Sequence, residues 1–145
     1  MPHPSFEHTV KFHEVQKQDG GIVAIPIITV TLIQPDGNRV DLPLIFDTGA
    51  STTTLRDDLY PLLGAPAWNA GEPVATGTAG GEVTAYRYQA TLEVFGKSVA
   101  CPVHLLQTIP KNPLYLGLFG REQIFEQFGF GFWESARELY ITLNP

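Results

Sequence analysis

The stretch Leu44-Ile45-Phe46-Asp47-Thr48-Gly49-Ala50-Ser51-Thr52 (LIFDTGAST) places one carboxylate directly after an apolar run and inside a turn rich in hydroxyl groups. The apolar residues have strand character, so we expect Asp47 where a buried strand ends. Gly49 has no Cβ, which allows backbone amides to approach the carboxylate closely. Thr48 and Ser51 add hydroxyls that can donate to it. Such a setting orients an acid and partly removes it from water, as is typical of catalytic acids and bases.

The tripeptide Asp47-Thr48-Gly49 can also be interpreted as an ordinary turn in which Asp47 has no catalytic role. In an Asx turn, an Asp side chain accepts a hydrogen bond from the backbone two residues further on and stays solvated. For an isolated Asp-Thr-Gly this interpretation is the more common one, because short motifs occur by chance. The choice between the two therefore depends on the rest of the chain.

Three segments, taken in order, carry a resemblance to a known family. Asp47-Thr48-Gly49-Ala50 and the apolar residues before it resemble the active-site turn of aspartic proteases. Leu118-Phe119-Gly120-Arg121 resembles the second signature of that family, in which two apolar residues and Gly-Arg precede a short helix. Between them, 75–81 (ATGTAGG) is similar to the glycine-rich flap of the retroviral-type, or retropepsin-like, branch. The ordered set covers roughly residues 22–143 and favours this family over a chance turn.

The resemblance implies a fold and a set of site residues. The fold would be all-β, a closed and mostly antiparallel β-barrel with one short C-terminal helix, spanning 22–145 after an N-terminal arm at 1–21. The glycines of 74–88 would let a flap close on an extended peptide, although a glycine loop taken alone is more often merely mobile. The implied roles are catalysis for Asp47, Thr48 and Gly49, substrate binding for Ala50, Ser51, Thr76, Gly77, Thr78, Ala79, Gly80 and Gly81, and a structural signature for Gly120 and Arg121.

The chain contains one Asp-Thr-Gly, whereas peptide hydrolysis by this chemistry needs two carboxyl groups. One carboxylate activates a water molecule while the other, protonated, donates to the carbonyl oxygen. Two carboxyl groups about 3 Å apart share a proton, because both cannot ionise at once. A two-fold homodimer would supply the second Asp47. The resemblance further implies that Thr48 bonds the partner's backbone across the axis.

The hydrophobic pattern by itself also predicts a β-rich chain with many short strands. Two pairs of apolar runs flank turn signals, and each pair predicts a β-hairpin. Two other segments have the spacing of short helices. The predicted hairpins are Ile22–Ile33 with Val40–Phe46 around 35–38 and Val83–Phe95 with Ser98–Leu106 around Gly96-Lys97, and the predicted helical segments are Leu55–Leu63 and Arg121–Phe128.

Two features of the match leave alternatives open. Retroviral sequences often carry an acid at the position of Ser51, where it pairs with the Arg of Gly-Arg. Ser51 cannot form that ion pair, so the partner of Arg121 is open, and an exposed Arg at a helix start fits equally well. The segment Asn112–Gly117 offers a competing apolar-glycine match a few residues earlier. We prefer Gly120 because Arg121 and the apolar pair at 124–125 follow it.

Composition limits the partners. Nine Lys and Arg against fifteen Asp and Glu give a net charge of −6, which argues against nucleic acid. Apolar stretches are too short to span a bilayer, and the first residues lack the pattern of a signal peptide, so we expect a cytoplasmic protein without a membrane partner. Cys101, in an apolar setting, predicts a buried thiol. The spacing of His3, His8 and His13 favours solvated histidines over a metal site.

The sequence therefore predicts a retropepsin-like aspartic endopeptidase that cleaves proteins or peptides as a homodimer, with water as the nucleophile and no cofactor or metal. The alternative is a dimeric peptide-binding or scaffold module on the same fold, without catalysis. A third possibility is a monomer that needs a partner or a processing step. Asp47 favours the enzyme, because a binding groove has no use for a partly buried acid.

Overall fold

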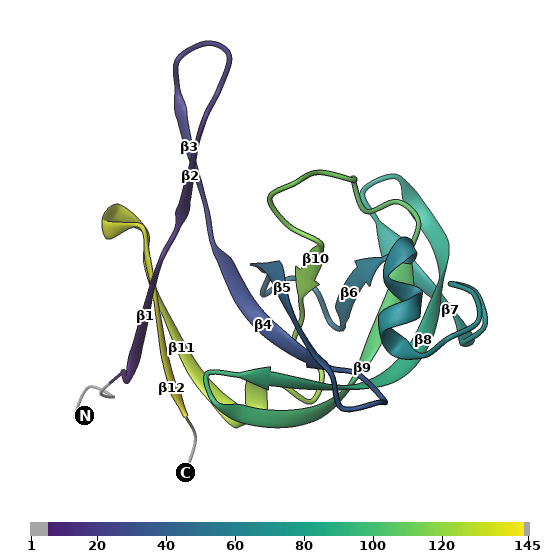
Figure 1. Cartoon of the computed structure of the whole chain (residues 1–145). Helices are drawn as coiled ribbons and strands as arrows, with labels where there is room; N and C mark the ends of the chain where they lie inside the picture. Colours follow the sequence, from purple (N-terminus) through teal and green to yellow (C-terminus); the bar gives the residue numbers. More distant parts are fainter. Residues whose placement is uncertain (1–5, 144–145) are drawn as a thin grey trace.

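A computed structural model of the chain describes residues 6–143, and strands make up most of it (Figure 1). Its short helices are of the 3-10 type. The elements are β1 (His8–Lys11), β2 (His13–Gln16), β3 (Ile22–Ile25), β4 (Ile27–Ile33), β5 (Arg39–Phe46), β6 (Thr53–Arg56), η1 (Asp57–Leu63), β7 (Glu72–Thr78), β8 (Gly81–Val94), β9 (Lys97–Leu106), β10 (Gly117–Phe119), η2 (Phe125–Gln127), β11 (Phe128–Trp133), η3 (Glu134–Ala136) and β12 (Glu138–Leu143).

The largest sheet has the strand order β4-β5-β10-β6-β9-β8-β7, and β4 also pairs with β8. Because of this extra pairing, the strands of the sheet ring round, as Figure 1 shows on its right side. Most pairs are antiparallel, whereas β5–β10 and β6–β9 are parallel. The prediction of an all-β chain is confirmed at this level.

The core lies inside the ring because the strands alternate between buried and exposed side chains. In β4, Ile28, Val30 and Leu32 are at most 2% exposed, and Leu42 and Leu44 of β5 are buried opposite them. The predicted first hairpin is confirmed for β4 and β5, which pair in antiparallel register.

The first apolar run does not form one strand, and this part of the prediction is wrong. Pro26 separates β3 from β4, because proline has no N–H to give to a ladder. The carbonyl of Pro26 still accepts a hydrogen bond from Phe46 N at 2.8 Å. Upstream of Pro26, β3 pairs with β2 instead of β5.

The second predicted hairpin is present as β8 and β9, but its turn lies one residue earlier than expected. Phe95 and Gly96 have positive φ angles of 49° and 81°, as the turns that suit a tight hairpin require. Lys97 is already the first residue of β9 and pairs with Val94.

Strands at the two ends of the chain form a second sheet with the order β1-β12-β11. Residues 8–11 and 13–16, which belong to the segment expected as an arm, form β1, which pairs with β12, and β2, which pairs with β3. In Figure 1 the β2–β3 hairpin projects away from the rest of the chain. His8 stacks on Phe95 with ring centroids 4.9 Å apart, and His13 is exposed, while His3 lies outside the described residues.

The helical segments are shorter than the sequence predicts. η1 occupies most of the first one and ends at Gly64, which has a left-handed φ of 70°. The short helix expected at 121–128 is reduced to the three residues of η2. Its backbone is interrupted at Gln123, whose φ of 65° is incompatible with a right-handed helix. Among residues 6–143, no helix is long and apolar enough to cross a membrane.

Candidate active site

Asp47 is the first residue after β5, and the turn that follows leads into β6. Its N–H donates to the carbonyl of Phe119 at 3.2 Å, and its own carbonyl accepts from Ala50 N at 3.2 Å. The first bond ties the turn to β10, which runs parallel to β5, and the second closes the turn itself. Asp47 is half-buried, whereas Thr48 and Gly49 are exposed.

The carboxylate of Asp47 is oriented by its own turn. Gly49 N donates to Asp47 Oδ1 at 2.9 Å, and a Cβ on Gly49 would lie 3.2 Å from the same oxygen. A side chain at position 49 would therefore crowd the acid. This hydrogen bond closes an Asx turn, which is expected whether Asp47 is a catalytic acid or a solvated turn residue. The surroundings of Asp47 distinguish these two interpretations.

Asp47 lines a cavity of about 520 Å³, large enough for peptide side chains. One wall comes from the turn, a second from the β7–β8 hairpin, and a third from β9, β10 and the loop between them. The lining residues are Asp47, Gly49, Ala50, Ser51, Thr52, Thr54, Thr76, Gly77, Thr78, Ala79, His104, Leu106, Thr108, Ile109, Pro110, Tyr115 and Leu118. Most of the predicted catalytic and substrate-binding residues are thus brought together.

Five predicted site residues do not line this cavity: Thr48, Gly80, Gly81, Gly120 and Arg121. Thr48 is exposed. Gly80 and Gly81 lie at the tip of the β7–β8 hairpin, where Thr78 Oγ1 donates to the Gly81 carbonyl at 2.7 Å. This hairpin is the predicted flap, and its tip is exposed.

Gly120 and Arg121 are hydrogen-bonded through their backbone N–H groups to the turn and to the start of β6. Gly120 N donates to Thr53 Oγ1 at 3.0 Å, and Arg121 N donates to the Ala50 carbonyl at 3.1 Å. The Arg121 side chain is exposed. A Cβ on Gly120 would lie only 2.3 Å from the backbone carbon of Thr52, so no larger residue fits there.

Replacing Gly120 by Ala is expected to destabilise the protein by about 3 kcal/mol or more, because the methyl group collides with backbone that cannot yield. Urea unfolding followed by circular dichroism measures the loss. The matched control is Gly80→Ala, where the nearest atom outside the local chain is 3.9 Å from the new methyl group. Equal stability of the two variants would show that the close approach at Gly120 is not rigid.

A polar network that no sequence pattern indicated links the turn to β8. Arg87 of β8 pairs with Glu122, with Nη2 donating to Oε1 at 2.7 Å and Nη1 to Oε2 at 3.2 Å. Thr52 Oγ1 donates to the same carboxylate at 2.8 Å. Arg87 Nη1 also faces His104 Nε2 at 3.4 Å. Glu122 is thus the acidic partner of Arg87 and not of Arg121.

The hydrogen bonds from Arg87 and then from Thr52 lower the pKa of Glu122 below its ordinary value of 4.5. An acid with a lowered pKa in the folded state contributes stability above its unfolded pKa, and this contribution is lost as pH falls through the folded pKa. We expect Glu122→Gln to be less stable than the wild type at pH 6, with the difference fading as the pH drops below about 4.5. Urea midpoints across this pH range test it, with Glu82→Gln on the exposed flap as control. A gap that stays constant with pH would contradict it.

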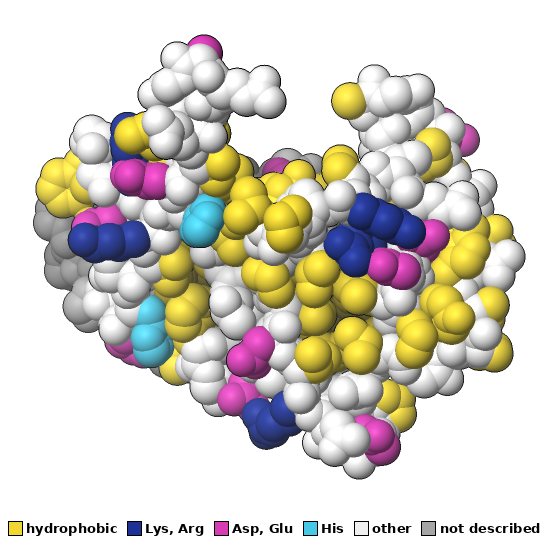
Figure 2. Space-filling view, turned by 45° about the horizontal axis from the view of Figure 1, so that its top comes forward, with side chains coloured by type: hydrophobic (Ala, Val, Ile, Leu, Met, Phe, Trp, Pro, Cys, Tyr) yellow, Lys and Arg dark blue, Asp and Glu magenta, His cyan; other side chains and the backbone are white. Residues whose placement is uncertain are grey.

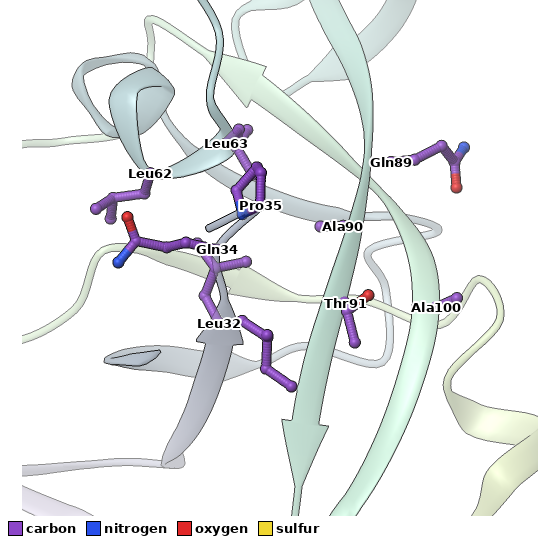
Figure 3. Close-up of a pocket in the computed structure, with 10 residues that line it drawn as sticks. Leu32, Gln34, Pro35, Leu62, Leu63, Gln89, Ala90, Thr91 and Ala100 are labelled. Carbon is purple, nitrogen blue, oxygen red and sulfur yellow. The ribbon is translucent and has the colours of Figure 1, made fainter. Parts of the chain in front are cut away.

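A second cavity, of about 400 Å³, lies elsewhere on the molecule between β4, η1, β8 and β9. Figure 3 shows its two amide side chains, Gln34 and Gln89, pointing away from each other. Its lining contains no carboxylate, imidazole or thiol among the described residues. It offers no convergent polar groups for chemistry, so Asp47 remains the candidate centre.

A scan against protein-family models and a search of curated proteins both find no match to this chain. The site therefore has to be judged on its own geometry.

Other reactive groups in the described part of the chain do not form a site. Residues 6–143 hold no cluster of three or more His, Cys, Asp or Glu that could bind a metal ion. Cys101 is fully buried, and burial raises the pKa of its thiol to about 12. The prediction of a buried thiol is confirmed, and such a thiol is a poor nucleophile.

Proposed function

We propose that the chain is an aspartic endopeptidase of the retropepsin-like type, active as a homodimer through two copies of Asp47. The observation that carries the proposal is the placement of Asp47 on a cavity that the glycine-rich β7–β8 hairpin also lines. An isolated Asx turn needs neither a cavity nor a flap. The ring of strands is consistent with the closed barrel that this family would require.

The chemistry follows from two carboxyl groups that share one proton across the two-fold axis. The ionised Asp47 removes a proton from the attacking water, and the protonated Asp47 of the second copy donates to the carbonyl oxygen of the scissile bond. Gly49 N holds one oxygen of each carboxylate, which fixes the direction of the acid without adding a charge.

The extended substrate would lie between the turn and the β7–β8 hairpin. Exposed glycines at the hairpin allow it to move and to cover the peptide, which excludes water from the reacting groups. Figure 2 shows hydrophobic side chains gathered on the face between two projections of the molecule, and exposed apolar surface of this kind is typical of sites that bind peptides or proteins.

The second copy would dock beside Thr48 and Gly49, the exposed residues of the turn. Phe46, which precedes Asp47, packs against Phe132 of β11 with ring centroids 5.1 Å apart. β11 is an edge of its sheet, and Phe132 and Trp133 are 47% and 59% exposed. Unpaired edges with exposed aromatic residues favour strand pairing with another chain. We name this surface, 128–133, the β11 edge.

Cleavage of a denatured protein substrate by the full chain at mildly acidic pH tests the proposal, with Asp47→Asn as the inactive reference. Fragments produced by the wild type alone support it. Peptide binding by both proteins without any cleavage would instead indicate a binding or scaffold module.

A further inference from the structure

A row of four side chains lies on neighbouring strands, and three of the four line the cavity. Strand register places Leu118 of β10 beside Thr54 of β6, Thr54 beside His104 of β9, and His104 beside Arg87 of β8. Directly paired residues project from the same face of a sheet, so the four form a continuous row. The row becomes more polar with distance from β10: an alkyl group, a hydroxyl, an imidazole and a guanidinium.

The contact with Arg87 favours one tautomer of His104. A guanidinium only donates hydrogen bonds, so His104 Nε2, 3.4 Å from Arg87 Nη1, is the acceptor. The proton of the neutral ring is then on Nδ1. His104 is 6% exposed and lines the cavity, and Nδ1 finds no acceptor within the described part of the chain. Burial, followed by the charge of Arg87, lowers the pKa of His104, which keeps the ring neutral.

Thr54 complements this donor with an acceptor. Its hydroxyl donates to the carbonyl of Thr52 at 3.0 Å, which leaves the lone pairs of Oγ1 to accept a hydrogen bond from an occupant. Leu118, next in the row, offers only apolar contact. Thr54, His104 and Leu118 all line the cavity.

Glu122 holds the polar end of the row in place. It binds Arg87 through both carboxylate oxygens and also accepts from Thr52. The guanidinium charge is therefore neutralised before any ligand arrives, so the row attracts no anion by charge. What it presents is one neutral donor beside one neutral acceptor.

We propose that His104 and Thr54 are specificity-determining residues that select a substrate side chain ending in a carboxamide, Asn or Gln. This inference rests on the proposed peptide groove. A carboxamide carries both an acceptor for His104 Nδ1–H and a donor for Thr54 Oγ1. A carboxylate would face Thr54 with a second acceptor, and an ammonium or guanidinium would face His104 and Arg87 with further donors. A purely apolar side chain would displace water from the His104 donor and leave that donor without a partner.

Peptide selection with the catalytically disabled Asp47→Asn chain tests the inference without requiring turnover. The immobilised protein is incubated with a synthetic library of short, fully randomised peptides, and the retained peptides are sequenced by mass spectrometry. We expect about tenfold enrichment of Asn and Gln at one position, the value of one neutral hydrogen bond. His104→Leu in the same background should abolish the enrichment. His104→Asn, whose amide nitrogen lies near the place of Nδ1, should retain it.

Thr54→Val provides an independent variant if His104→Leu fails to fold, and it should lose the enrichment too. Retained peptides with acidic, basic or apolar preference, or no preference, would overturn the inference. Cleavage of the same library by the wild type is the separate measure of the proposed function. Carboxamide enrichment without cleavage would overturn the proposed endopeptidase activity but not the specificity. Cleavage without enrichment would overturn the proposed preference for Asn and Gln but not the activity. If neither is seen, both proposals are wrong.

Discussion

Replacing Asp47 by Asn is expected to lower kcat/KM by at least about a thousandfold, because neither copy can then hold or release the shared proton. Asn has the shape of Asp and keeps an oxygen for the bond from Gly49 N, so the turn stays folded. Initial rates with a fluorogenic peptide at mildly acidic pH measure the effect. Sedimentation velocity checks that the dimer persists.

A matched control uses another carboxylate in a turn. Asp36 accepts from Asn38 N at 2.9 Å in the exposed turn between β4 and β5, so Asp36→Asn makes the same chemical change far from the cavity. We expect this variant to cleave at the wild-type rate. Substantial cleavage by Asp47→Asn, or equal losses in both variants, would contradict the assignment of the acid.

The second large effect concerns the β11 edge. Replacing Trp133 by Lys is expected to weaken the dimer by about thirtyfold or more, since buried Trp residues commonly dominate interface energies and a lone charge is costly to bury. Trp133 is the more exposed of the two aromatic residues at this edge, and it pairs with Glu138, beside which a Lys is favourable. The fold of the single chain should therefore persist.

Activity should disappear together with the dimer. Specific activity of Trp133→Lys is expected to rise with protein concentration, whereas that of the wild type stays constant in the same range. The control is Ile22→Lys, which changes an apolar residue of similar exposure, 56%, in a different sheet. If Trp133→Lys is still a dimer at the protein concentrations at which the wild type is a dimer, the interface does not include Trp133.

The local features of the turn at 47–52, the candidate active-site turn, could be predicted from the sequence because each depends on neighbouring residues. Alternation along 40–46 places Asp47 after a buried strand, and Gly49 signals a close backbone approach. The β7–β8 hairpin has turn glycines between two alternating runs. These patterns are short in range, and the structure contains them as predicted.

Errors occurred where one residue changes the backbone direction. Pro26 divides an apolar run that reads as a single strand, and Gln123 adopts a left-handed conformation that the helical spacing of 121–128 does not reveal. The turn at Phe95-Gly96 is displaced because Phe95 takes a positive φ, which is uncommon for an aromatic residue. The secondary-structure propensity of a residue predicts the backbone conformation poorly at such positions.

The polar row and its network were beyond sequence reasoning for a different reason. Arg87, His104 and Glu122 lie on three separate segments, and no spacing along the chain links them. They meet only because β6 and β9 run parallel and β8 pairs with β9 in one register. A shift of one residue in either pair would turn His104 to the other face.

Subunit mixing determines whether each active site needs Asp47 from two chains. Wild-type protein is dissociated and reassociated with increasing amounts of Asp47→Asn, and cleavage is followed at constant wild-type concentration. If both acids are needed, random pairing with a ninefold excess of the variant leaves about one dimer in a hundred with two intact acids, so activity falls to about a tenth of the undiluted value. Activity that stays constant as Asp47→Asn is added would show that a single Asp47 is sufficient and would contradict the account.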